Sequence, residues 1–142
     1  MRQYVGMAPR HPWLDVLRAV PLFAECTDDE LERIDSLFSE AEVAVGHVLV
    51  REGSIGRQFI VIVSGRASVA REGLELNVLG PGDFVGEMAL LHNTPRGATV
   101  TATTPMKLYV ANAGEFAALL GEAPSIAAKI RRADEERQVS RD

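Results

Sequence analysis

The chain has 142 residues, of which 46% are hydrophobic and 25% charged, so it is long and apolar enough for one domain with a buried core. Fifteen basic and twenty acidic side chains give a net charge of −5, which argues against a generally basic surface for nucleic acid or anionic lipid. Cys26 is the single cysteine, which excludes an internal disulfide. No run reaches the ~20 apolar residues of a membrane span, and none has the pattern of a secretory signal. The sequence therefore predicts a cytoplasmic protein.

Helical spacing of apolar residues extends from Pro12 to Phe38. The segment TDDELERIDSLF begins with Thr27 and Glu30 at the spacing of a capping box, in which each side chain binds the other residue's backbone N–H. The apolar positions that follow lie on one helical face: Leu31, Ile34, Leu37 and Phe38. We therefore expect helices in residues 12–40, and flexible tails at residues 1–11 and 140–142.

Short β segments dominate residues 41–111. They include QFIVIV, RASVAR, ATVTAT and KLYVA, and glycine-bearing turns separate them. Residues 112–139 return to a helical pattern, first in AGEFAALLGEA and then after Pro124. The sequence predicts one α+β domain over residues 12–139, an antiparallel β jelly roll (double-stranded β-helix) flanked by N-terminal helices and two C-terminal helices.

One loop, GPGDFVGEMALLHNTPRGATV, carries more than turn residues. Gly86 permits a close backbone approach, and EMALL is long enough for a single helical turn. Such a turn would point the free N–H groups of Met88, Ala89 and Leu90 in one direction, which makes an anion site without any basic side chain.

Two charged side chains in this loop suggest a ligand with two chemically different parts. The fork of Arg96 suits two phosphate oxygens, and Gly97 lets its own N–H come close to them. A carboxylate only accepts hydrogen bonds, so Glu87 beside an anion must face a donor on the same ligand, and a sugar hydroxyl is the obvious candidate.

The stretch GEMALLHNTPRGATV resembles the phosphate-binding cassette of cyclic nucleotide-binding domains, the family of catabolite activators, protein kinase A regulatory subunits and bacterial cyclic-nucleotide-gated channels. VAVGHVLVREGS and FIVIVSGRASV resemble the first strands of that family. The resemblance implies that Glu87 binds the ribose 2′-hydroxyl and Arg96 the cyclic phosphate. It also implies that the final helix covers the base, with Arg131 as the stacking residue. The ligand-binding residues expected in the cassette (residues 86–99) are Gly86, Glu87, Met88, Ala89, Arg96, Gly97, Ala98 and Thr99, and the amides of Ala89 and Gly97 complete the phosphate cradle.

The chain departs from the family pattern at three positions. Arg57 stands where the family often has an aspartate that holds the phosphate-binding arginine, which puts the support of Arg96 in doubt, and Val85 replaces a phenylalanine. Gly97 has no hydroxyl for the guanine amino group, which favours cAMP as the ligand, although Thr99 leaves cGMP open.

Catalysis and DNA binding find less support in the sequence. His11, His47 and His92 are isolated, so we expect no metal site and no cupin-type oxygenase, and no nucleophile and base are paired. The short, mixed-charge segment after the last strand does not suggest a helix-turn-helix. We therefore expect a non-enzymatic, cyclic nucleotide-binding regulatory module that needs no cofactor and acts on an unidentified effector through its C-terminal helices. The alternative is a ligand-insensitive adaptor of the same fold.

Overall fold

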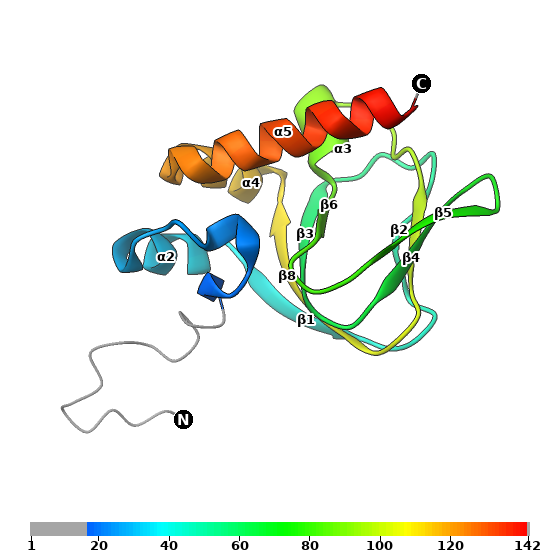
Figure 1. Ribbon diagram of the computed structural model, residues 1–142, viewed down its shortest axis with the longest axis horizontal. Coiled ribbons are helices and arrows are strands. Elements are labelled where there is room, and N and C mark those ends of the chain that lie inside the picture. Colours follow the sequence, from blue (N-terminus) through cyan, green and yellow to red (C-terminus); the bar gives the residue numbers. More distant parts are fainter. Residues whose placement is uncertain (1–16, 142) are drawn as a thin grey trace.

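The computed structural model describes residues 17–141, so the predicted tail at residues 1–11 and the predicted start of the first helix at Pro12 lie outside the described residues. Two antiparallel four-stranded sheets form the centre of the molecule (Figure 1), with strand orders β1-β8-β3-β6 and β2-β7-β4-β5. The first sheet consists of β1 (Ser39–Val43), β8 (Met106–Asn112), β3 (Gln58–Ser64) and β6 (Phe84–Val85). The second consists of β2 (Val48–Val50), β7 (Thr99–Ala102), β4 (Ala67–Arg71) and β5 (Leu74–Leu79). The predicted antiparallel roll is confirmed.

The β3 strand shows how the roll and the helices share one sheet. Alternate side chains of a strand point to opposite faces, and here both faces are covered. Ile60 and Ile62 belong to the core between the two sheets, whereas Phe59 and Val61 belong to a second core under the helices. A continuous apolar run, QFIVIV, is therefore the pattern that this position requires.

The N-terminal helical region ends earlier than predicted. A 3-10 turn, η1 (Pro21–Phe23), precedes α2 (Asp28–Asp35), and the predicted capping box between Thr27 and Glu30 is present with bonds of 2.8 and 3.1 Å. The expectation of helix up to residue 40 was wrong, because Ser39 already pairs with Val110 of β8. Phe38 still packs against the core, but from the connection that follows the helix.

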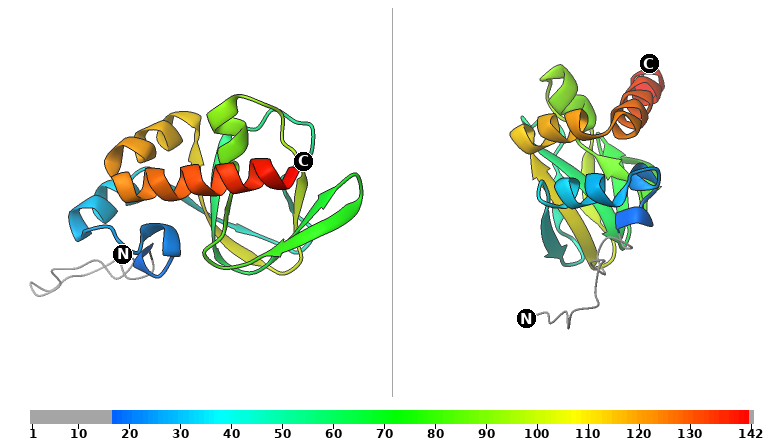
Figure 2. Two further views of the ribbon diagram at one scale, coloured as in Figure 1. Left: turned by 45° about the horizontal axis from the view of Figure 1, so that its top comes forward. Right: turned by 90° about the vertical axis from the view of Figure 1, so that its left-hand side faces the viewer.

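Two helices follow β8, as predicted: α4 (Ala113–Glu122) and α5 (Pro124–Arg141). A second capping box, formed by Asn112 and Glu115, starts α4. The last helix reaches Arg141, so residues 140 and 141 belong to α5 and not to a tail. Figure 1 shows α5 crossing in front of the short helix α3 (Glu87–His92), and the right-hand view of Figure 2 shows the two helices side by side. Ile126 and Ile130 bury the apolar side of α5.

Contacts from the N-terminal segment hold both C-terminal helices. The Lys129 ammonium donates to the carbonyl of Pro21 at 2.7 Å, and Arg33 of α2 pairs with Glu122 of α4 at the same distance. Among residues 17–141, no helix is long and apolar enough to cross a membrane.

Candidate ligand-binding site

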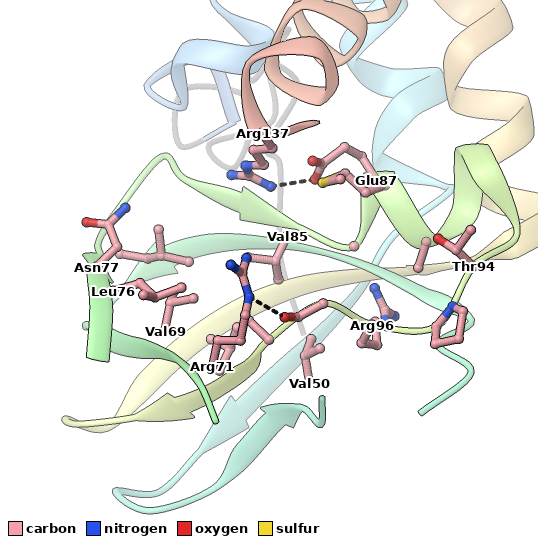
Figure 3. A pocket seen from close by; sticks show the side chains of 18 residues that line it. Val50, Val69, Arg71, Leu76, Asn77, Val85, Glu87, Thr94, Arg96 and Arg137 are labelled. Atoms are coloured by element: carbon pink, nitrogen blue, oxygen red, sulfur yellow. Dashed lines mark hydrogen bonds and ion pairs between the residues drawn. The ribbon is translucent and has the colours of Figure 1, made fainter. Parts of the chain in front are cut away.

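A cavity of about 480 Å³ opens between the second sheet, α3 and α5, a size within the range of small-molecule sites. Its walls are largely apolar, and Figure 3 shows charged side chains entering from several elements. The apolar part of the lining comes mainly from Val50, Val69, Leu76, Leu79, Val85 and Val100. The charged part comes from Arg71, Glu87, Arg96 and Arg137.

Glu87 is the first residue of α3 and is fully buried. Gly86 positions it with φ 106°, in the left-handed region, and a Cβ at this glycine would lie 2.3 Å from the carbonyl oxygen of Gln58. The Oε1 atom of Glu87 accepts a hydrogen bond of 2.6 Å from Nη1 of Arg137, whereas its buried Oε2 atom has no hydrogen-bond partner. Burial raises the pKa of this carboxyl, and the charge of Arg137 opposes the rise.

Arg96 lies across the cavity and is 7% exposed. Its Nη2 atom donates to the carbonyl of Gln58 at 2.8 Å, and its buried Nη1 atom has no partner. The backbone is fixed as well, because Arg96 donates to the carbonyl of Ser54 and accepts from the amide of Gly53, both at 2.8 Å. Burial lowers the pKa of Arg96, and the charge of Glu87 opposes this.

The support of Arg96 differs from the expectation based on the family. Arg57, the residue at the usually acidic position, is exposed, and a backbone carbonyl holds the guanidinium of Arg96 in place of a carboxylate. Gly56 provides the space: a Cβ there would lie 1.6 Å from Nε of Arg96. Gly56 was not among the predicted site residues, because its contact with Arg96 joins positions that are 40 residues apart in the sequence.

Most of the predicted site residues meet at this cavity. Those that line it are Gly86, Glu87, Met88, Ala89, Arg96, Gly97 and Ala98. Thr99 is not part of the lining, and its hydroxyl accepts a hydrogen bond of 2.9 Å from the amide of Glu52. The amide of Leu90, predicted to be free, donates to the carbonyl of Gly86 at 3.2 Å, because α3 is a six-residue helix and therefore longer than the predicted turn.

Arg131 does not reach the cavity; it is exposed on α5, and Arg137 lines the cavity in its place. Six residues separate the two, which turns the side chain by about 240° around the helix and moves it about 9 Å along the axis. The apolar pattern contained the missing signal, because Ile126, Ile130, Asp134 and Arg137 follow at spacings of four, four and three and share one face.

Two further contacts organise the cavity. The guanidinium of Arg137 lies 5.4 Å from the ring centroid of Phe84 and donates to the Phe84 carbonyl at 2.8 Å. Nε of Arg71, a residue that the sequence analysis did not single out, donates to the Gly97 carbonyl at 3.1 Å (Figure 3). Both ends of the cassette are therefore tied to neighbouring elements. No group of three His, Cys, Asp or Glu side chains suited to a metal occurs in residues 17–141.

An antiparallel roll in which a buried acid and a buried arginine line one cavity has the features of a domain for a small polar anion. The cyclic nucleotide-binding domain family matches residues 40–123, more than half of the chain, and the chain belongs to this family of regulatory domains. The resemblance seen in the sequence is thus confirmed.

Relatives place this domain within longer proteins. The chain is 38% identical over 123 residues to a cyclic nucleotide-gated potassium channel of Rhizobium etli, a match covering 87% of this chain and 34% of the channel. It is 36% identical over 109 residues to the cAMP-dependent protein kinase regulatory subunit of Schizosaccharomyces pombe, covering 76% and 26% of the two chains. The cAMP-bound PfPKA-R (141–441) structure superposes with a TM-score of 0.79 at 24% identity, covering 89% of this chain and 44% of that one, which supports the shared fold.

Proposed function

We propose that the chain binds a cyclic nucleotide, with the ribose 2′-hydroxyl at Oε2 of Glu87 and the cyclic phosphate at Nη1 of Arg96. The supporting observation is that both atoms are buried, lack a hydrogen-bond partner and belong to side chains lining the same cavity. A buried polar atom without a partner costs about 1–3 kcal/mol, and a hydroxyl donor with a phosphate acceptor would satisfy both atoms at once.

Within the cyclic nucleotides, we propose cAMP as the preferred ligand over cGMP. Gly97 lines the cavity and has no hydroxyl for the guanine amino group. Thr99, the residue that left cGMP open, does not line the cavity. The apolar wall that includes Val69 and Leu76 suits a purine face.

The proposed response is a movement of the C-terminal helices. Leu90 and Leu91 of α3 pack against the core that contains Phe116 of α4. Ordering of the cassette would therefore change the packing of α4. Arg137 binds the same carboxylate that would bind the ribose, which connects α5 to the ligand. The receiver would be an effector domain or protein, as in the longer relatives, and the module would act in the cytoplasm by binding without turnover.

Isothermal titration of the chain with cAMP and with cGMP tests this function. The Arg96→Ala variant should weaken cAMP binding about 10- to 150-fold, the equivalent of a charge-assisted hydrogen bond worth about 1.5–3 kcal/mol. Arg57→Ala is the matched control, because Arg57 is exposed and should leave the affinity unchanged. Absence of heat with either nucleotide would favour the alternative of a ligand-insensitive adaptor.

A further inference from the structure

Two acid–base contacts of opposite sense join α3 to α5. The acid of the first pair, Glu87, lies on α3 and its base, Arg137, on α5. In the second pair the base is on α3 and the acid on α5: Nε2 of His92 lies 2.8 and 3.0 Å from the two carboxylate oxygens of Asp134. The two contacts sit near opposite ends of α3, so together they fix how α5 lies on the cassette helix.

The second pair lies outside the ligand cavity, since neither His92 nor Asp134 lines it. The Asp134 side chain is only 9% exposed, whereas that of His92 is 43% exposed. A buried carboxylate is costly unless a cation or donor compensates it. The negative charge of Asp134 also contributes to the raised pKa of Glu87, so the two carboxylates influence each other. Asp134 thus contacts His92 and also acts on Glu87, which couples the two contacts.

The titratable side chains described on the elements that pack against α3 lie mainly on α5. The β3 strand, which also packs against α3, contains no titratable side chain, and α3 itself contributes only Glu87. On α5, Asp134 contacts His92 and Arg137 contacts Glu87. The remaining charged side chains in this part of α5 are exposed: Arg131, Arg132, Glu135 and Glu136. Histidine is the side chain that ordinarily changes charge between about pH 5 and 8.

We propose that the His92–Asp134 contact is a proton-dependent positioning pair that holds α5 on the cassette helix. A neutral imidazole provides one hydrogen bond to the buried carboxylate, whereas a protonated one adds a full charge and also offsets the repulsion between Asp134 and Glu87. Protonation of His92 therefore favours the arrangement in which α5 is packed on α3. If the proposed function holds, cyclic nucleotide affinity also becomes dependent on the charge of His92.

Hydrogen exchange of the α5 amides in the ligand-free chain tests the positioning pair without reference to any ligand. His92→Gln keeps a neutral hydrogen-bonding side chain and leaves the α5 sequence intact, so intrinsic exchange rates cancel when variant and wild type are compared at one pH. At about pH 6 the wild-type amides should exchange roughly fivefold more slowly than those of the variant, and at about pH 8 the ratio should fall below about twofold. His47→Gln, at an exposed histidine in the β1–β2 connection, is the matched control and should match the wild type at both pH values.

A ratio of wild type to His92→Gln that is the same at both pH values would overturn the proposal. Asp134→Asn provides a second variant in case His92→Gln fails to fold, and its α5 amides should lose the same pH-dependent protection. Titration with cAMP at the two pH values forms the second arm, in which the ratio of wild-type to His92→Gln affinity should be about two- to fivefold higher near pH 6. Failure of cAMP to bind either protein would count against the proposed function, while the exchange experiment would still decide the positioning pair.

Discussion

Gly56→Ala should separate ligand binding from folding, because the change acts on one guanidinium. The new Cβ would lie 1.6 Å from Nε, 2.0 Å from Cζ and 2.2 Å from Nη2 of Arg96. Non-bonded heavy atoms settle about 3.5–4.0 Å apart, so the guanidinium would have to move by about 2 Å. Hydrogen bonds weaken steeply over such a displacement. The lost charge-assisted bond to phosphate, about 1.5–3 kcal/mol, corresponds to an affinity lower by about 10- to 150-fold.

Calorimetric titration with cAMP and urea denaturation of the same samples measure the two effects of Gly56→Ala separately. Stability should fall by only about 1–3 kcal/mol, because the Arg96 bond to the Gln58 carbonyl is the main folded contact disturbed. Gly121→Ala is the matched control, since its Cβ would meet no atom within 4 Å and it lies within α4, where alanine should stabilise by roughly 0.5–1 kcal/mol. A folded Gly56→Ala protein with wild-type affinity would refute the inferred role of Arg96 as the phosphate ligand.

Two further predictions concern the buried carboxylate. Arg137→Ala removes the cation paired with Glu87 and should lower the free energy of unfolding by about 1–3 kcal/mol in urea titrations. Arg132→Ala, at an exposed position of the same helix, is the control and should have almost no effect. Equal losses of stability in the two variants would contradict the pairing of Arg137 with Glu87. Burial raises the pKa of Glu87, so the folded chain binds this proton more tightly than the unfolded chain does. The unfavourable contribution of the ionised group to stability is fully present above the folded pKa and shrinks as pH falls through it. Urea midpoints between neutral pH and the ordinary carboxyl pKa of 4.5 should therefore show wild type gaining stability relative to Glu87→Gln on acidification, and a constant difference would count against a raised pKa.

Local signals in the sequence predicted those features whose physical cause is local. Both capping boxes join residues three positions apart, so the pattern at Thr27 was sufficient to predict its hydrogen bonds. The two-faced burial of β3 was encoded in a continuous apolar run, and glycine-bearing turns marked most strand ends. The cassette carried its own chemistry in one short loop, which explains why most of its lining residues could be named in advance.

Features that depend on distant segments were missed or misplaced. Nothing near Gly56 in the sequence indicates that the Arg96 side chain will lie over its Cα, because the two residues meet only after the roll has formed. The prediction of Arg131 in place of Arg137 failed for a similar reason. The rotation of α5 about its axis is set by Ile126 and Ile130, which pack in the core under the helices. Before the roll, the apolar spacing continues to Phe38, but the helix ends earlier because the next residues pair with β8 as strand β1. Strand pairing thus outweighed the local helical periodicity.

The way Arg96 is held has a consequence for the charge of the site. An aspartate at position 57 would support the guanidinium but would also neutralise it, whereas the carbonyl of Gln58 supports it and leaves its full charge. Glu87 pairs with Arg137, and Nε of Arg71 donates to the carbonyl of Gly97. Among the described residues that line the cavity, Arg96 is a buried cation whose Nη1 atom has no hydrogen-bond partner. One such cation matches the single negative charge of a cyclic phosphodiester. The arginine at position 57 therefore need not weaken the proposed site. The Gln58 carbonyl orients the guanidinium of Arg96, and no carboxylate described within hydrogen-bonding distance cancels the charge that would attract the phosphate.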